Sequence, residues 1–194
     1  MFKIFYKKLN FKLIIIHFFE KKYCSNFIIK IKNKWKAQFE LKIDATTNQI
    51  WELISSPSNL ELFHPFCKSN KVIIWPGKKS IDELVYLNGL TYKREFYSWE
   101  KLKGYSLFIG EKEKEQSYVV WEIFDRNESN YLKITVYPYF LRNMPKLISY
   151  LPYKFIVIPA LESYLKSVIG GINYYLTTKT KTPKNYFGHH KWFS

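Results

Sequence analysis

The sequence is poor in cysteine and in the motifs of common catalytic sites. Its two cysteines, Cys24 and Cys67, lie in different segments, without a C-x-x-C pair or a histidine at ligand spacing. This pattern argues against a disulfide framework or a zinc site and fits a reducing compartment, so we expect a cytoplasmic protein. The motifs G-x-G-x-x-G, G-x-x-x-x-G-K-[ST], H-E-x-x-H and G-x-S-x-G are also missing, which disfavours the usual nucleotide, metalloprotease and hydrolase sites. The sequence predicts no metal and no cofactor.

Residues 1–34 contain no apolar run long enough to cross a bilayer. Their longest run is Leu13–Phe19, whereas a membrane span needs about 20 apolar residues. A small-residue cleavage site of a secretory signal is also missing. The segment is rich in lysine and aromatic residues, so it could bind an anionic membrane surface and make the protein peripheral there. Alternatively, the fold starts near Trp35 and residues 1–34 lie outside it.

Acidic residues are scarce at both ends of the chain, and this locates the net charge of +15. Residues 1–36 hold ten lysines and one acidic residue, and residues 177–194 hold four lysines and no acidic residue. The middle of the chain is nearly neutral. A nucleic-acid-binding domain should carry its positive charge on the folded part, so nucleic acid is an unlikely partner. We expect the ends to be solvated.

Between residues 37 and 140 the apolar residues mostly follow the two-residue period of β-strands. The first strand is Ala37–Ile43. Thr46-Thr47-Asn48-Gln49 then has the spacing of a capping box that starts a short helix, and a second short helix is expected from Ser56-Pro57 to about Phe63. Asn88-Gly89 predicts a hairpin. The six further predicted strands are Lys68–Trp75, Ser80–Leu87, Leu90–Trp99, Tyr105–Gly110, Gln116–Asp125 and Tyr131–Phe140.

Residues 143–176 are predicted to form a long helix. Pro159 is expected to kink it or to begin its second half. The pair Gly170-Gly171 destabilises a helix by about 1 kcal/mol per glycine, which indicates either a close approach by a sheet or ligand or an ordinary irregularity. Residues 177–194 read as a basic tail, in which His189-His190 is more typical of a solvated segment than of a metal site. The apolar stripe of the helix consists of Leu161, Leu165, Val168, Ile172 and Tyr175.

The order of these elements resembles the START-like superfamily, also called SRPBCC. The resemblance rests on Phe39–Ile43 with Asp44-Ala45, on Ile50–Ser55 and on Leu60 through His64-Pro65-Phe66. Members include birch-pollen-allergen proteins, START lipid carriers and polyketide cyclases. The resemblance implies an α+β helix-grip domain over residues 36–176, with a seven-stranded antiparallel sheet curled around the long C-terminal helix. It also implies a cavity between sheet and helix.

Several side chains are candidates to line such a cavity. His64 either hydrogen-bonds a ligand at the cavity mouth or caps the end of its helix. Arg94 shares its strand face with Tyr92, so if that face is inward it needs a buried partner, for which Glu122 is a candidate. The reverse parity would place both in water. The remaining candidates are aromatic residues with polar tips, which also serve as ordinary core residues: Tyr86, Tyr92, Trp121 and Tyr137.

Three functions are compatible with the sequence. The first is to bind or carry a hydrophobic small molecule or lipid in the internal cavity. The second is a cyclase or dehydratase acting on a polyketide-like or other apolar substrate, with His64, Arg94, Glu122 and a tyrosine as the groups that move protons. The third is binding to nucleic acid or to a membrane surface through the basic ends.

Overall fold

The computed structural model describes residues 26–194. The chain divides into two units, Met1–Lys34 and Trp35–Ser194. In the first unit, residues 26–32 are helical. The membrane-binding prediction for residues 1–34 falls largely on residues outside the described part and stays a prediction. All elements below belong to the second unit.

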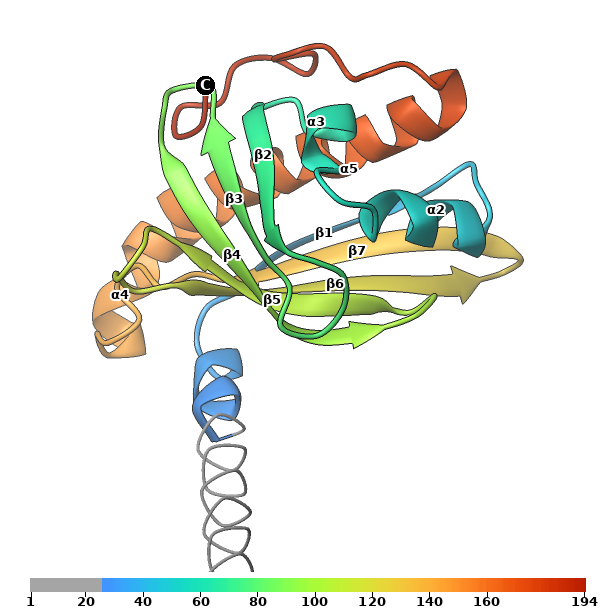
Figure 1. Cartoon of the computed structure of the whole chain (residues 1–194). Coiled ribbons are helices and arrows are strands. Elements are labelled where there is room, and N and C mark those ends of the chain that lie inside the picture. The colour runs from blue at the N-terminus through green and yellow to red at the C-terminus, as the bar shows by residue number, and fades with distance from the viewer. Residues whose placement is uncertain (1–25) are drawn as a thin grey trace, which may run out of the picture. The chain divides into compact units, whose positions relative to one another are not determined.

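Seven strands form one antiparallel sheet, as predicted (Figure 1). The order across the sheet is β1-β7-β6-β5-β4-β3-β2, so the first two strands in sequence are its two edges. Every strand from β2 to β7 pairs with a strand next to it in sequence, whereas β1 pairs with β7. The strands are β1 (Ala37–Lys42), β2 (Cys67–Ile74), β3 (Ile81–Tyr86), β4 (Thr91–Glu100), β5 (Gly104–Gly110), β6 (Ser117–Arg126) and β7 (Ser129–Tyr137).

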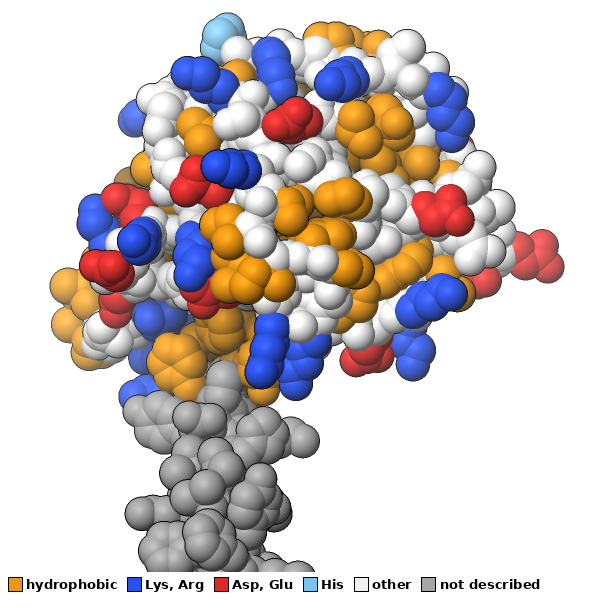
Figure 2. Space-filling model, viewed as in Figure 1, with side chains coloured by type: hydrophobic (Ala, Val, Ile, Leu, Met, Phe, Trp, Pro, Cys, Tyr) orange, Lys and Arg blue, Asp and Glu red, His pale blue; other side chains and the backbone are white. Residues whose placement is uncertain are grey.

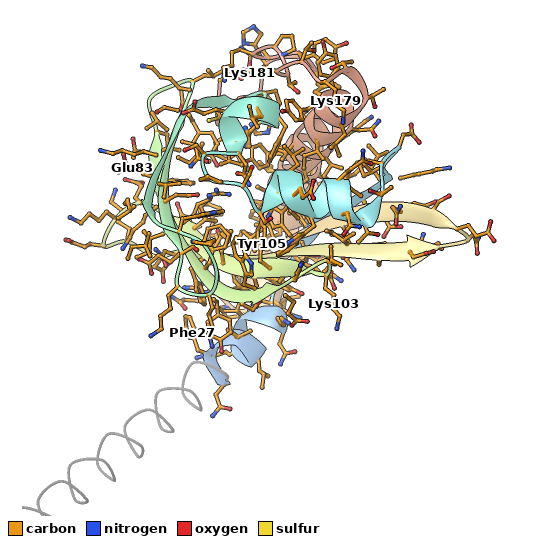
Figure 3. The ribbon with its side chains drawn as sticks, turned by 45° about the vertical axis from the view of Figure 1, so that its right-hand side comes forward. Phe27, Glu83, Lys103, Tyr105, Lys179 and Lys181 are labelled. Carbon is orange, nitrogen blue, oxygen red and sulfur yellow. The ribbon has the colours of Figure 1, made fainter. Side chains whose placement is uncertain are left out.

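Alternation of residue types along the strands separates the two faces of the sheet. On β3, Asp82, Leu84 and Tyr86 are buried, while Glu83 points away from the body of the domain (Figure 3). In the same view Tyr105 lies inside and Lys103 projects outward. The last strand ends at Tyr137, earlier than the predicted Phe140. The reason is Pro138, which has no N–H to donate to the neighbouring strand.

Two short helices connect β1 to β2. The capping box that starts α2 (Thr47–Ile54) is confirmed, because the Gln49 N–H donates to Thr46 Oγ1 (3.2 Å) and the Thr46 N–H donates to Gln49 Oε1 (2.9 Å). The second helix, α3 (Leu60–Phe63), is shorter than predicted. Ser58 has a positive φ of 53°, which interrupts a helix before Leu60, so Pro57 lies in a turn.

The C-terminal helical stretch has three parts: α4 (Lys146–Pro152), the π-helical turn η1 (Tyr153–Val157) and α5 (Ile158–Thr178). Pro159 lies in the first turn of α5, where its missing N–H costs little, so the prediction that it begins the second half is confirmed. Among the described residues, this stretch is long and apolar enough to cross a membrane by length and composition. In the fold, α5 packs against β1, β7 and α3 and supplies the core with Leu165, Ile169 and Ile172.

The glycine pair of α5 lies where other segments approach the helix. A Cβ on Gly171 would lie 2.0 Å from the backbone oxygen of Phe63 at the end of α3. A Cβ on Gly170 would lie 2.9 Å from the ring of Phe187 in the C-terminal segment. The expectation of a close approach is therefore confirmed, but the approaching groups are α3 and the chain end instead of the sheet or a ligand.

Candidate functional site

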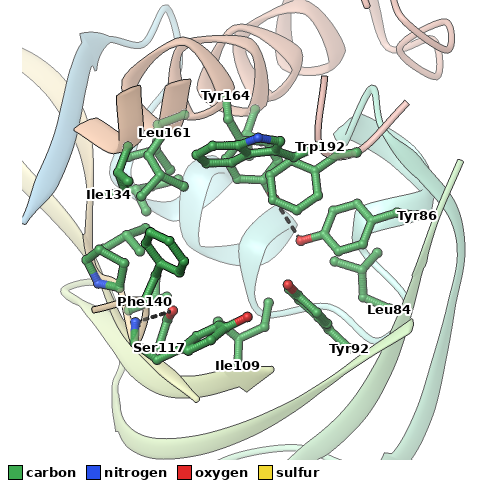
Figure 4. Close-up of a pocket in the computed structure, with 18 of the residues that line it drawn as sticks. Leu84, Tyr86, Tyr92, Ile109, Ser117, Ile134, Phe140, Leu161, Tyr164 and Trp192 are labelled. Atoms are coloured by element: carbon green, nitrogen blue, oxygen red, sulfur yellow. Dashed lines mark hydrogen bonds between the residues drawn. The ribbon is translucent and has the colours of Figure 1, made fainter. Parts of the chain in front are cut away.

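A cavity of about 580 Å³ lies between the inner face of the sheet and α5 (Figure 4). Its floor consists of inward side chains of β5, β6 and β7, such as Ile109, Val119 and Ile134. Leu161 and Tyr164 of α5 cover it from the opposite side. Because alternate residues of a strand point to one face, the apolar half of each strand makes the cavity wall. The volume falls in the range of small-molecule sites.

A chain of polar side chains crosses one end of this apolar cavity. His64 Nε2 lies 2.8 Å from the Tyr164 hydroxyl. The Tyr164 hydroxyl in turn lies 3.1 Å from the Tyr86 hydroxyl (Figure 4). His64 Nδ1 accepts a hydrogen bond of 3.2 Å from the Phe66 N–H. The proton of the imidazole is therefore on Nε2, which donates to Tyr164. His64 ends α3 through its backbone and lines the cavity with its ring, so the helix-capping role predicted for its side chain is not the one observed.

Burial holds the groups of this chain neutral. Desolvation, with a smaller contribution from the charges of Arg94 and Lys184, lowers the pKa of His64 from 6.5 to about 3. Desolvation also raises the pKa of the Tyr86 and Tyr164 hydroxyls well above their usual value. At neutral pH these three hydrogen-bonded side chains therefore present uncharged donors and acceptors to the cavity.

The depressed pKa of His64 predicts a loss of stability in acid. Unfolded His64 takes up a proton near pH 6.5, whereas the folded state takes one up only near pH 3. The unfolded state thus binds more protons in this window, and the free energy of unfolding should fall by up to about 1.4 kcal/mol per pH unit. Urea unfolding of the wild type and of His64→Gln at pH values across this window measures the difference in slope. A variant with the same slope as the wild type would contradict the prediction.

Arg94 faces the cavity, but its partner differs from the predicted one. It donates to Asp82 through Nε (2.7 Å) and Nη2 (2.5 Å), across the hairpin of β3 and β4. Asp82 is 0% exposed and Arg94 is 3% exposed. Burial alone would lower the pKa of Arg94, but the Asp82 carboxylate raises it, so the guanidinium stays charged. Glu122 instead pairs with Lys133 at 2.8 Å on the outer face, so its predicted role as the Arg94 partner is wrong.

The predicted aromatic candidates divide between the two faces of the sheet. Tyr86, Tyr92 and Trp121 line the cavity. Burial, followed by the influence of Tyr139, raises the pKa of Tyr92 to about 12, so its hydroxyl is also neutral. Tyr137 is absent from the lining and packs on Tyr118, at a ring separation of 6.0 Å. The cavity thus contains five of the seven predicted residues and lacks Glu122 and Tyr137.

The C-terminal segment closes one side of the cavity, so the prediction of a solvated tail is wrong. Thr182 donates to the Leu62 and Gly171 carbonyls at 2.9 and 3.0 Å. His190 is buried and its Nε2 donates to the Ala160 carbonyl at 3.0 Å. Trp192 and Phe193 line the cavity, and Phe193 stacks on Tyr86 with a ring separation of 4.5 Å. Aromatic residues among the lysines of this segment were the available sequence signal for burial.

Comparison with known proteins adds evidence on the fold. No protein-family profile matches the sequence, and no curated protein matches it significantly. Among similar solved structures is DynU16, a protein of the dynemicin biosynthetic locus, with a TM-score of 0.58, 12% identity and coverage of 75% of this chain and 48% of DynU16. Ara h 8.0201 gives a TM-score of 0.54 with 10% identity over 74% of this chain and 98% of that one. The chain has the helix-grip fold.

Another helix-grip neighbour is SA2116 of Staphylococcus aureus, a protein of unknown function. Its TM-score is 0.57 with 13% identity, over 75% of this chain and 94% of that one. The fold implied by the sequence resemblance is therefore confirmed. At these identities the likeness concerns the fold, and the function of this helix-grip chain has to be argued from its own cavity.

Proposed function

We propose that the chain binds an uncharged, largely apolar small molecule or lipid in its internal cavity. The observation that carries this proposal is the composition of the cavity wall. Among the described residues that line it, Arg94 is the one with a permanent charge, and it forms an ion pair with Asp82. A charged ligand in contact with this wall would find no counter-ion there. It would also lose its hydration, which costs free energy. An apolar ligand fills the space without that loss.

The polar chain at one end supports recognition of a small polar group on such a ligand. Tyr86 and Tyr164 share one hydrogen bond, and each oxygen keeps capacity for another. Tyr92 adds a third neutral hydroxyl on the same wall. A hydroxyl or carbonyl oxygen on an otherwise apolar molecule suits this arrangement, because a few placed polar groups fix a ligand's orientation in an apolar site.

The same groups are poorly suited to proton transfer near neutral pH. An efficient general base has a pKa near the working pH, whereas the pKa of His64 is about 3 and the tyrosine pKa values are raised. Glu122, the predicted acidic partner in a cyclase or dehydratase, lies on the outer face. These properties favour binding over acid–base catalysis as the function of the cavity.

The experiment introduces a bulky side chain on the face of β6 that lines the cavity. The same substitution on the opposite face of β6 is the control. Val119 lines the cavity and the next residue, Val120, belongs to the opposite face of β6. Binding of the fluorophore ANS to the wild type, Val119→Phe and Val120→Phe is measured, together with native mass spectrometry of each purified chain. We expect Val119→Phe to weaken cavity binding by about tenfold or more and to remove any co-purified molecule. Val120→Phe should bind as the wild type does.

Two results would reject the proposal. One is equal ANS affinity in all three proteins, because the ligand would then bind outside the cavity. The other is a wild type that binds no apolar probe and carries no extractable molecule. Circular dichroism of each variant checks that the sheet has formed, so that a loss of binding is not a loss of folding.

A further inference from the structure

The segment between β7 and α5 exposes an apolar surface that the core does not use. Six large apolar side chains there are at least half exposed, and we call them the α4 patch: Phe140, Leu147, Ile148, Leu151, Phe155 and Ile156. In Figure 2 apolar side chains stand out at the left edge, where Figure 1 places α4. Contiguous apolar surface of this kind marks an interaction site in most proteins.

The amphipathicity of this segment is the reverse of that in a core helix. Ser149, Tyr153 and Val157 follow each other at four-residue spacing and are buried. Ser149 Oγ accepts from Trp35 Nε1 at 2.9 Å, and Trp35 stacks on Tyr153 at 5.4 Å, so this buried side is largely polar and aromatic. The outward stripe, Leu147, Leu151 and Phe155, is apolar. Leu147 is 89% exposed, which costs free energy in water unless another surface covers it.

The charges around the α4 patch indicate which surface covers it. The sequence has no Asp or Glu between Glu128 and Glu162, and Glu115, an acidic residue that contacts the start of this segment, is paired with Arg142 at 3.6 Å. Lys146 and Lys154 flank the stripe, and each lies over an aromatic ring, Trp35 at 5.9 Å and Tyr150 at 5.2 Å. Apolar and aromatic side chains bordered by lysines match the boundary of an anionic bilayer, in which the rings enter the interface and the ammonium groups meet the phosphates.

The α4 patch is also continuous with the cavity. Phe140 and Ile156 belong to the exposed set and to the cavity lining. Pro152 and Val157, from the same turns, line the cavity as well. A bilayer in contact with this patch would therefore lie against one wall of the apolar cavity.

We propose that the α4 patch docks the domain on an anionic phospholipid membrane. This inference does not depend on the identity of a cavity ligand, and the residues of the α4 patch are different from those of the segment 1–34. Docking covers the apolar stripe, while Lys146 and Lys154 contribute attraction to the lipid phosphates. Each lysine near such a surface strengthens binding by roughly fivefold, which corresponds to about 1 kcal/mol.

The test is co-sedimentation of the full chain with vesicles of mixed phosphatidylcholine and phosphatidylglycerol. The variant is Leu147→Gln/Ile148→Gln, an adjacent exposed pair that does not line the cavity. The matched control is Ile73→Gln/Ile74→Gln, an adjacent pair on edge strand β2 that is 55% and 53% exposed. We expect the patch variant to bind at least about tenfold more weakly and the control to bind as the wild type does. ANS binding in the cavity should be unchanged in both.

A charge variant and a measurement of mass complete the experiment. Lys146→Gln/Lys154→Gln should weaken binding to the mixed vesicles and leave any binding to pure phosphatidylcholine unchanged. Vesicle binding that is absent in the wild type, or equal in the patch variant and its control, overturns the proposal. Light scattering that shows a dimer of the wild type and a monomer of the patch variant also overturns it, because a second copy of the chain would then cover the patch.

Discussion

Replacing Asp82 with asparagine is expected to lower the free energy of unfolding by about 3–5 kcal/mol. The change is nearly isosteric, but it leaves the Arg94 guanidinium buried without a counter-ion in a wall that is otherwise uncharged. Breaking a buried pair by removing one partner is among the most destabilising single changes, since the remaining charge keeps its desolvation cost. Urea unfolding followed by tryptophan fluorescence measures the effect.

The neighbouring residue provides a matched control. Glu83→Gln makes the same chemical change one position along β3, on the face that points outward. It should change stability by about 0.5 kcal/mol or less. The double variant Asp82→Asn/Arg94→Gln removes both charges and should lose less stability than the sum of the two single variants. If Asp82→Asn and Glu83→Gln had similar small effects, the buried pair would not have the role described.

Replacing Gly171 with alanine is expected to cost about 3 kcal/mol or more. The new Cβ would overlap the Phe63 backbone oxygen, at 2.0 Å, and a backbone atom cannot rotate out of the way. Either α5 or α3 must move, and a movement of α3 displaces His64 from Tyr164. We therefore expect a lower midpoint of urea unfolding, together with weaker ligand binding in the cavity.

Gly170 is the matched control for this prediction. A Cβ there would meet the tip of the Phe187 ring, which is partly exposed and can shift. Alanine also gains about 1 kcal/mol of helix propensity over glycine. Gly170→Ala should therefore stay within about 1 kcal/mol of the wild type. Equal destabilisation by the two variants would mean that the helix itself, and not the contact with α3, is sensitive at this position.

The fold could be predicted from the sequence because local signals agreed with it. The capping box at Thr46, the turn at Asn88-Gly89 and the alternation along the strands each define an element without knowledge of its neighbours. The parity of Arg94 with Tyr92 left its inward and outward directions open, and the structure shows that it points inward. Asp82 could have been chosen as its partner by the same argument, because it alternates with Leu84 and Tyr86.

Features that depend on contacts distant in sequence could not be predicted. Nothing in residues 177–194 taken alone indicates that Phe193 stacks on Tyr86, since the hydrogen bonds that hold the segment reach back to Leu62 and Asn88. The α4 patch was also missed. Its apolar residues have the helical spacing expected of a core face, and the structure is needed to find that they point away from the core.

The strand order has a consequence for the course of folding. Each strand from β2 to β7 can pair with a strand that is next to it in sequence, so these six strands can assemble through successive hairpins. β1 has no such partner: Ala37 pairs with Val136, near the end of β7. Closing so long a loop slows formation of the contact. We therefore expect β1, made first, to join the sheet last, and its amide hydrogens to be among the last of the sheet to gain protection during refolding.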